Sequence, residues 1–330
     1  MKKTTAVLVL AALAAAALAT LAACGGGGAK VALVAYSTPR EAYAKLIPAF
    51  QKTSAGTGVE FTESYGSSGE QSRAVEAGLP ADVVEFSLAP DMARLVKADL
   101  VDKSWDQNQY DGFVTRSVVV LVVRKDNPKG ITTWADLTKP GVEVIEPNPF
   151  TSGGAKWNIM AAYGAQLQQG KSEQEAKAYL ADLFKHVPVQ DKSAREALQT
   201  FAGGKGDVLL SYENEAIAAQ QAGEAVDYVV PDETILIENP LAVTKDAGSS
   251  PDAKAFYDFL YTQEAQAIFV SKGYRPVVDG VAGADGFPTP AKLFTITDLG
   301  GWDAVNAAFF APDGSVMASI EQGLGISTQQ

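Results

Sequence analysis

The sequence predicts an α/β protein built around a parallel or mixed β-sheet. Short runs rich in valine and other strand-forming residues alternate along the chain with segments of helical periodicity, and this alternation is typical of strands joined by helices. The chain after its N-terminal segment is long enough for two domains of ordinary size. An apolar content of 47% and a charged content of 20% indicate a globular chain rather than a disordered one.

The N-terminal segment is typical of an export signal. Lys2 and Lys3 precede the continuous apolar run 6–21, and Leu21-Ala22-Ala23-Cys24 matches a lipoprotein cleavage box. No stop-transfer pattern follows the run, which favours a signal peptide over a membrane span. We therefore expect a signal peptide over residues 1–23, followed by a lipidated Cys24 and a glycine tether over residues 24–30. Because Cys24 is the only cysteine, an intramolecular disulfide is excluded.

The chain has more acidic than basic residues, and this excess bears on which partners it can bind. The formal net charge is −12 at pH 7, and removal of the signal takes away two lysines and no acidic residue. Such a charge argues against nucleic-acid binding and against any membrane contact other than through the lipid.

Strand candidates occupy both halves of the chain. They are residues 31–36, 59–64, 82–88, 118–124, 207–210, 228–231 and 235–237. The run 118–124 is long and apolar, so we expect a strand that is buried on both faces. Helices are expected between and after the strands, including residues 89–97, 134–137, 173–184, 216–222, 253–261 and 264–272.

The first helix has the clearest start signal. Thr38 is expected as its N-cap, with Pro39 at the first helical position. Pro48 is expected to kink or shorten this helix. Apolar residues recur at helical spacing and predict one buried face, made of Tyr43, Leu46, Ile47 and Phe50.

The stretch Ser152-Gly153-Gly154 has the features of an anion site. It lies between a short strand with a proline-stiffened loop and a helix that runs on from Trp157. A helix N-terminus exposes unpaired N–H groups and the positive end of the helix dipole. Because the glycines have no side chains, an anion can approach these N–H groups closely. An ordinary N-cap is the alternative for this stretch taken alone.

Other strand ends share this design. Each offers a hydroxyl or an unshielded backbone N–H, at Ser37, Ser68, Ser193-Ala194 and Tyr212. Because ligands bind at the carboxyl ends of strands in open α/β sheets, these residues are expected to form one site of hydrogen-bond donors for a small oxyanion. Three cationic residues lie near the helix starts, and we expect their side chains to be solvated: Arg40, Lys156 and Arg195. Two acidic residues lie close to the expected site, and we expect them to accept hydrogen bonds from loop N–H groups: Asp191 and Glu213.

The chain resembles the sulfate- and thiosulfate-binding proteins of bacterial ATP-binding-cassette importers, which are type II periplasmic solute-binding proteins. The most specific match is Pro147-Asn148-Pro149 followed by Ser152-Gly153-Gly154-Ala155 and Trp157. The other matching segments span nearly the whole chain after the export signal, at residues 36–41, 66–71, 81–84, 121–128, 140–157, 207–215 and 274–276.

This resemblance implies two α/β lobes, each a mixed sheet flanked by helices, with the ligand cleft between them. Lobe 1 would contain residues 31–122 and 238–330, and lobe 2 residues 123–237. The resemblance also implies that the anion is held by the Ser152 hydroxyl and by backbone N–H groups at Ser37, Ser68, Gly153, Gly154 and Ala194. Tyr212 stands where the family has a tryptophan, and a phenol can donate or accept where an indole N–H only donates.

The expected function is that of an exported, lipid-anchored solute-binding protein. It would capture sulfate or thiosulfate and deliver it to the permease of an importer, as a monomer, without a metal, a cofactor or nucleic acid. Molybdate, tungstate or phosphate is the alternative ligand. A structural lipoprotein is another alternative, and so is an exported hydrolase. The latter would have to use His186, the only histidine, and the chain has no Gly-x-Ser-x-Gly motif.

Overall fold

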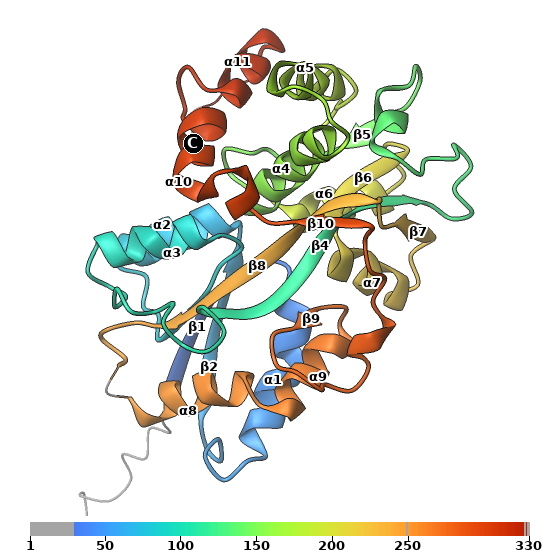
Figure 1. Ribbon diagram of the computed structural model, residues 1–330. Helices are drawn as coiled ribbons and strands as arrows, with labels where there is room; N and C mark the ends of the chain where they lie inside the picture. Colours follow the sequence, from blue (N-terminus) through green and yellow to red (C-terminus); the bar gives the residue numbers. More distant parts are fainter. Residues whose placement is uncertain (1–29, 249, 327, 329–330) are drawn as a thin grey trace, which may run out of the picture.

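The computed structural model describes residues 30–248, 250–326 and 328. Its strands form one ten-stranded sheet with the order β2-β1-β3-β8-β4-β6-β5, to which β7, β9 and β10 add at β4 and β8. Helices flank this sheet in the upper and lower halves of the molecule (Figure 1). The predicted α/β fold is therefore confirmed. The predicted signal peptide and Cys24 lie outside the described residues.

The sheet is mixed. Its parallel pairs are β1 with β2, β1 with β3, β5 with β6 and β8 with β10, and the remaining pairs are antiparallel. The strands are β1 (Lys30–Tyr36), β2 (Glu60–Gly66), β3 (Val83–Glu85), β4 (Phe113–Arg124), β5 (Val144–Ile145), β6 (Val208–Tyr212), β7 (Val226–Val229), β8 (Glu233–Val243), β9 (Arg275–Pro276) and β10 (Lys292–Phe294).

Two long strands, β4 and β8, connect the two halves of the sheet. The first half of β4 pairs antiparallel with the middle of β8, and the two strands run together between the lower and upper parts of the molecule (Figure 1). Beyond this shared segment, β8 pairs with β3 in one half, and β4 pairs with β6 and β7 in the other. The segment 118–123 of β4 is buried throughout, which confirms the predicted strand buried on both faces.

The helices alternate with the strands over most of the chain. The α-helices are α1 (Arg40–Gln51), α2 (Ser68–Glu76), α3 (Ala89–Lys97), α4 (Gly153–Gln168), α5 (Glu173–Phe184), α6 (Ala194–Ala202), α7 (Glu213–Gln221), α8 (Pro251–Leu260), α9 (Gln263–Ser271), α10 (Gly301–Val305) and α11 (Val316–Gly323). Short 3-10 or π segments are η1 (Trp134–Thr138), η2 (Ala284–Gly286), η3 (Thr297–Leu299) and η4 (Asn306–Phe310).

Helix α1 departs from its predicted start and from the predicted effect of its proline. The N-cap is Pro39 instead of Thr38, and the Thr38 hydroxyl lies 3.3 Å from the Tyr274 hydroxyl. The helix also continues through Pro48 to Gln51. The buried residues on its inner face hold it there despite the lost backbone hydrogen bond.

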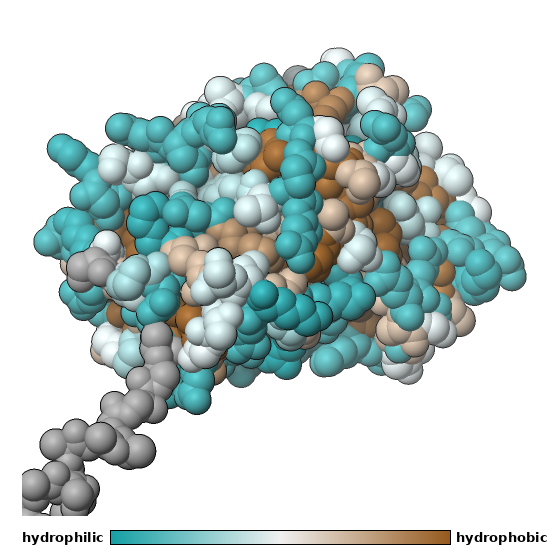
Figure 2. All heavy atoms as spheres, turned by 90° about the horizontal axis from the view of Figure 1, so that it is seen from below, coloured by the Kyte–Doolittle hydropathy of each residue, from teal (hydrophilic) through white to brown (hydrophobic). Residues whose placement is uncertain are grey.

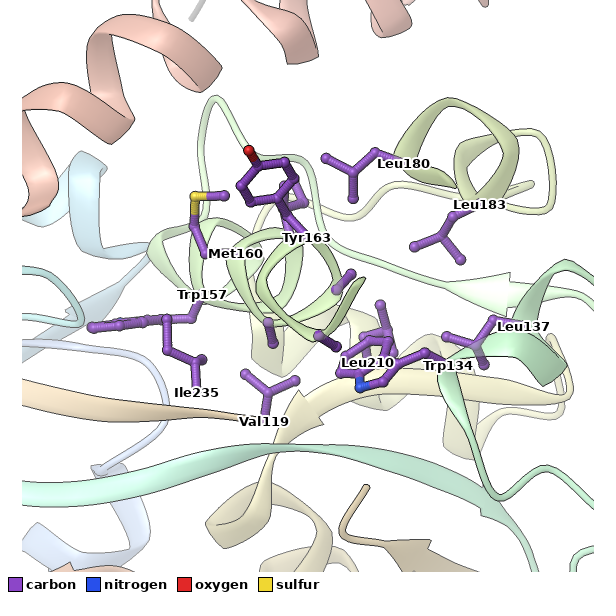
Figure 3. Close-up of a cluster of buried hydrophobic side chains, with 14 of the residues drawn as sticks. Val119, Trp134, Leu137, Trp157, Met160, Tyr163, Leu180, Leu183, Leu210 and Ile235 are labelled. Atoms are coloured by element: carbon purple, nitrogen blue, oxygen red, sulfur yellow. The ribbon is translucent and has the colours of Figure 1, made fainter. Parts of the chain in front are cut away.

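The largest core surrounds α4. Trp157, Met160 and Tyr163 of this helix are buried together with residues of β4, β6 and α5 (Figure 3). Small residues let the other elements approach closely, and a Cβ at Gly164 would lie 2.2 Å from the ring of Phe294. Burial of one large apolar side chain contributes about 1.5–3 kcal/mol. This core therefore fixes the position of the N-terminal end of α4, where Gly153 lies.

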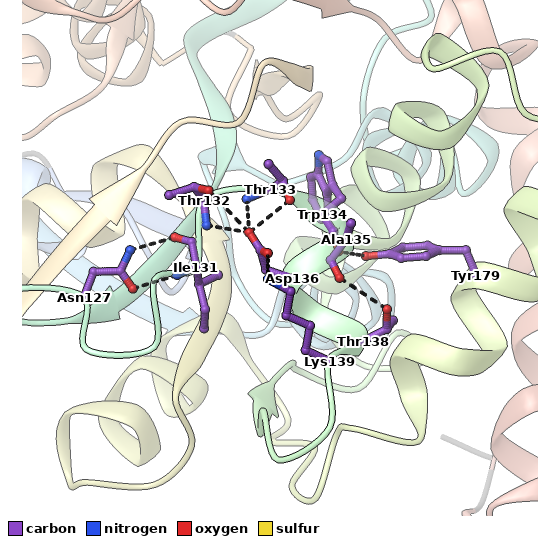
Figure 4. A network of polar contacts seen from close by, with 10 residues as sticks. All are labelled: Asn127, Ile131, Thr132, Thr133, Trp134, Ala135, Asp136, Thr138, Lys139 and Tyr179. Carbon is purple, nitrogen blue, oxygen red and sulfur yellow. Dashed lines mark hydrogen bonds and ion pairs between the residues drawn. The ribbon is translucent and has the colours of Figure 1, made fainter.

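A polar network fixes the segment before this core. Asp136 in η1 accepts hydrogen bonds from the N–H groups of Thr132 and Thr133, each at 2.8 Å, and pairs with Lys139 at 2.6 Å (Figure 4). Burial opposes ionisation of this carboxyl, but these donors lower the pKa of Asp136. Trp134 is buried beside them, so the short helix predicted at 134–137 closes one side of the core.

The C-terminal elements pack against the half of the molecule that contains α4. Strand β10 pairs with the start of β8, and residues of η4 and α11 belong to the core around α4. Figure 1 shows α10 and α11 beside α4 and α5. We therefore propose that the two lobes meet along β4 and β8 and that residues 292–326 belong with lobe 2, although the predicted division assigned residues 238–330 to lobe 1.

Candidate functional site

All of the predicted binding residues meet in one cavity between the two halves of the sheet. The cavity is small, with a volume of about 10 Å³. Among the described residues, those that line it bear hydroxyls or are glycine or alanine, and none is charged: Tyr36, Ser37, Thr38, Ser67, Ser68, Ser87, Ser152, Gly153, Gly154, Ser193, Ala194 and Tyr212. The residues that the sequence pattern singled out thus line one cavity, Ser193 among them, but the pattern missed Tyr36, Thr38, Ser67 and Ser87.

Helices α2, α4 and α6 begin at this cavity. Their N-caps are Ser67, Ser152 and Ser193, each with an extended backbone. The Ser152 hydroxyl accepts from the N–H of Ala155 at 3.3 Å, and the Ser193 hydroxyl accepts from the N–H of Glu196 at 3.2 Å. These caps satisfy the third N–H of α4 and α6. The earlier N–H groups, which have no partner within a helix, are left for a ligand.

The hydroxyl of Ser68 is already fully used. It donates to the Asp91 carboxylate at 2.6 Å and accepts from the N–H of Ser87 at 2.9 Å. Asp91 is held in turn, because the Ser72 hydroxyl donates to its carbonyl oxygen at 2.7 Å. What Ser68 can offer a ligand is therefore its backbone N–H, and its side chain fixes the start of α2.

Ser87 connects the two halves of the site. Its hydroxyl lies 2.7 Å from the Tyr212 hydroxyl, and its carbonyl oxygen accepts from the Trp157 indole N–H at 2.8 Å and from the Asn239 amide at 3.4 Å. The signal that could have identified Ser87 is its place at the end of the predicted strand 82–88, which is the criterion that identified Ser37.

Tyr212 is 1% exposed and closes one wall of the cavity. Burial raises the pKa of Tyr212, so the phenol stays protonated at neutral pH. Because its oxygen lies against Ser87, the phenol holds the two halves of the site together.

The two glycines of the central motif are closely confined. A Cβ at Gly153 would lie 2.7 Å from the Ser87 hydroxyl and 2.8 Å from its Cβ. A Cβ at Gly154 would lie 3.2 Å from the Cβ of Ala194 and 3.6 Å from the Tyr212 ring. A side chain at Gly153 would therefore push the halves apart, whereas one at Gly154 would enter the cavity itself.

The prediction that the nearby cations are solvated is wrong for Arg195. Its guanidinium donates to Glu41 of α1 at 2.7 Å and to Glu215 of α7 at 2.8 Å. A further bond of 3.3 Å reaches the carbonyl oxygen of Thr38. Glu215 is 0% exposed, so Arg195 neutralises a buried carboxylate and joins α6 to α1 across the cleft.

The prediction of a solvated side chain is also wrong for Lys156, whereas Arg40 is exposed as expected. The Lys156 ammonium bonds to Asn306 at 3.2 Å and lies 5.1 Å from the centre of the Phe310 ring. Lys156, Arg73 and Arg94 line a second hollow that also contains Asp91 and shares Ser152 and Gly153 with the first. Positive charge therefore gathers beside the cavity, although none lines it.

The predicted roles of the two acids also change. The Glu213 carboxylate accepts from Arg275 at 2.7 Å and 3.2 Å instead of from a loop N–H. The Asp191 carboxylate accepts from the Thr200 hydroxyl at 3.1 Å. It is the main-chain oxygen of Asp191 that orients the central loop, by accepting from the N–H of Asn148 at 2.8 Å.

His186, the residue that the alternative of an exported hydrolase requires, lies apart from the cavity. His186 does not line the cavity, and its Nδ1 lies 3.0 Å from the carbonyl oxygen of Val142. Among the described residues, no group of three or more His, Cys, Asp or Glu side chains could hold a metal ion. No helix within residues 30–248 and 250–326 is long and apolar enough to cross a membrane.

Comparison with known proteins identifies the family. Residues 31–275 match the family model described as bacterial extracellular solute-binding protein. The chain belongs to this family. The description of the family places its members outside the cytoplasm, and the relatives given below are solute-binding proteins.

Individual solute-binding proteins of this family are similar over most of their length. A sulfate-binding protein of Synechococcus elongatus is 44% identical, over 89% of this chain and 87% of its own. A thiosulfate-binding protein of Pseudomonas aeruginosa is 35% identical, over 87% and 90%. Among solved structures, the sulfate-binding protein SubI from Mycobacterium tuberculosis matches with a TM-score of 0.82 and 48% identity, over 84% of this chain and 98% of its own.

Proposed function

We propose that this solute-binding protein captures sulfate or thiosulfate between its lobes and delivers the anion to the permease of an importer. The observation that carries the proposal is a cavity where α2, α4 and α6 begin and where no charged side chain lines the wall. Helix N-termini favour anions through their free N–H groups and their dipoles. The names of the similar sulfate- and thiosulfate-binding proteins support the choice of ligand.

Each predicted residue has a role in this proposal. The backbone N–H groups of Ser37, Ser68, Gly153, Gly154 and Ala194 would donate to the anion. The Ser152 hydroxyl can donate to the anion while it accepts from Ala155, because a hydroxyl does both. Tyr212 would close the wall from lobe 2 while its oxygen stays with Ser87.

The proposed cleft can couple ligand capture to closure. The Arg195–Glu41 pair and the Ser87–Tyr212 contact join opposite sides of the cavity. In this proposal, these contacts form when the lobes come together. They therefore stabilise the closed state in addition to the hydrogen bonds that the bound anion makes with both lobes. Hinge closure around a ligand is the usual motion of such proteins, and the permease would recognise the closed form.

The proposed location is the outer face of the membrane, where Cys24 would carry the lipid. The cleavage box at 21–24 and the glycines after it support this attachment. We further propose that the protein acts as a monomer and without a cofactor, metal or catalytic step, since the cavity lining offers donors to an anion and no catalytic group.

Calorimetry with purified protein tests the proposed ligand. Sulfate, thiosulfate, phosphate, molybdate and tungstate would each be titrated at neutral pH. The proposal predicts saturable binding of sulfate or thiosulfate at one site, with the other anions much weaker. If molybdate or phosphate bound tightest, the proposed ligand would be wrong. If none of these anions bound, the cavity would not be an oxyanion site.

A further inference from the structure

A carboxyl group that the proposed anion site does not use lies buried beside it. Glu85 is the last residue of β3, where it pairs with Ala35 of β1 and Leu241 of β8. It is 0% exposed. One carboxyl oxygen accepts from the Tyr43 hydroxyl, and the other has no hydrogen-bond partner.

The ionisable groups around Glu85 are phenols from several elements. Those that interact with its charge are Tyr36 of β1, Tyr43 of α1, Tyr65 of β2, Tyr261 after α8 and Tyr274 before β9. None of the ion pairs formed by the described residues involves Glu85. A carboxylate at this place would therefore be buried without a cation.

Glu85 lies near the anion cavity, because it stands two residues before Ser87, and its sheet partner Ala35 stands two residues before Ser37; both serines line the cavity. Tyr36 lines the cavity, and its buried hydroxyl has no hydrogen-bond partner. The Tyr274 hydroxyl lies 3.3 Å from the hydroxyl of Thr38, which also lines the cavity. A charge on Glu85 would thus lie in the same dry region as the anion, where the repulsion between like charges is weakly screened.

Burial decides the protonation state of this carboxyl. It raises the pKa of Glu85 to about 8, and the hydrogen bond from Tyr43 offsets part of that rise. Glu85 is therefore mainly protonated at neutral pH. A dianion in the neighbouring cavity further disfavours the charged form and so raises the pKa of Glu85 in the complex.

We propose that Glu85 makes anion affinity depend on protonation, so that the protein binds the dianion with Glu85 neutral and takes up a proton at this carboxyl in mildly alkaline solution. This inference rests on the proposed function. Its sign follows from linkage. Affinity is at its full value while Glu85 is protonated in the free protein, and it falls as the pH rises through the pKa of the free protein.

Titration calorimetry of sulfate in buffers of different ionisation enthalpy measures this proton uptake. The parent protein should take up almost no proton at neutral pH and a substantial fraction of one proton at about pH 8.5. Its Kd should be flat below neutrality and should rise above pH 8 by up to about tenfold per pH unit. Sulfate binding with a flat Kd and no proton uptake across this range would overturn the inference and leave the proposed function intact. No sulfate binding at any pH would instead contradict the proposed function.

Variants assign the proton to Glu85. Glu85→Gln keeps the size of the side chain and removes its charge, so this variant should bind sulfate within about twofold of the parent at neutral pH and show no proton uptake. Tyr43→Phe removes the donor that lowers the pKa of Glu85, so the pH at which affinity falls should move upward. Glu321→Gln changes another buried carboxyl, on α11 beside Gln190, and should retain the proton uptake of the parent. Uptake that survives in Glu85→Gln would place the proton elsewhere.

Discussion

At the scale of single residues, side-chain hydroxyls at this site act mainly on the protein itself. Ser68 bonds to Asp91 and to the N–H of Ser87, and Ser152 and Ser193 cap their helices. Each hydroxyl fixes a helix start, and the ligand is left mainly with backbone N–H groups, to which the Ser152 hydroxyl can add one side-chain donor. Anion binding by such a site depends on the position of the backbone. We therefore expect affinity to fall most when a substitution places a new side chain where the ligand would lie.

Gly154→Val tests this sensitivity. The new side chain would begin 3.2 Å from the Ala194 Cβ and fill part of the cavity, so sulfate binding should be lost while the fold remains. Gly323→Val is the matched control, because a Cβ at Gly323 meets nothing within 4 Å. Calorimetry and thermal unfolding would be measured on both. Sulfate binding by Gly154→Val at parental affinity would show that the motif is only a helix start.

Ser152→Ala should weaken sulfate binding without abolishing it. A hydrogen bond to a charged group contributes roughly 1.5–3 kcal/mol, or about ten- to a hundredfold in Kd. The variant also loses the cap of α4, which costs about 0.5–2 kcal/mol of stability. Ser172→Ala removes the corresponding cap of α5 and separates the two effects. It should lower stability similarly but leave Kd unchanged, and an equal loss of affinity in both variants would contradict a direct role of Ser152.

At the scale of elements, the ion pairs across the cleft are the feature that the sequence did not reveal. Arg195 lies in the first turn of α6, where a solvated side chain is the usual outcome, and nothing in its own segment indicates Glu41 on a distant helix. The N-terminal ends of α2 and α6 were predictable because serine caps and glutamate at capping-box spacing are local signals. The pairing of Arg195 depends on how α1 and α6 are brought together, which is a tertiary property.

Arg195→Gln should lower the free energy of unfolding. It leaves the buried Glu215 without its partner, and breaking a buried pair costs up to about 3–5 kcal/mol. Pairing Arg195→Gln with Glu215→Gln removes the unpaired charge, so the double variant should recover part of the loss. As a control, Lys254→Gln breaks an exposed pair with Asp258 and should change stability by about 1 kcal/mol or less. If chemical unfolding gave the single and double variants equal stability, the buried pair would not have this role.

At the scale of the whole molecule, the fold class and a set of residues that line one cavity could be predicted from the sequence, whereas the pairing of β8 with β3 and β4 could not. Alternating strands and helices indicated the sheet, and the strand ends indicated the cavity. Strand β8 was expected only as the short run 235–237, because Asn239-Pro240 resembles a loop signal and only pairing with β3 and β4 makes it strand. The short helix α10 begins after Gly300 without a side-chain cap, whereas Ser315 caps α11 and was a local signal that the prediction did not use. Residues of η4 and α11 lie in the core around α4.

The proposed attachment to the membrane can be tested at Cys24. The face seen from below in Figure 2 is largely hydrophilic, with apolar residues in hollows between polar ones. Attachment is therefore expected to depend on Cys24. Cys24→Ala should move the protein from the membrane fraction to the soluble exported fraction, because stable anchoring needs the acyl chains that the cysteine would carry. Unchanged membrane partition on cell fractionation would contradict the lipid anchor, and Ser104→Ala at an exposed loop provides a control for the effect of substitution itself.

The central claim is that the cavity holds a fully deprotonated oxyanion by hydrogen-bond donors alone. Sulfate satisfies such a site at neutral pH, whereas phosphate keeps a proton that would face donors without an acceptor. Tyr212 is a wall residue whose oxygen could accept that proton where the indole of a tryptophan could not, although the Ser87 hydroxyl already lies against it. Calorimetric titration of sulfate and phosphate at neutral pH, into the parent and into Tyr212→Trp, measures this directly. The account predicts strong preference for sulfate in both proteins, and comparable affinity for the two anions in the parent would contradict it.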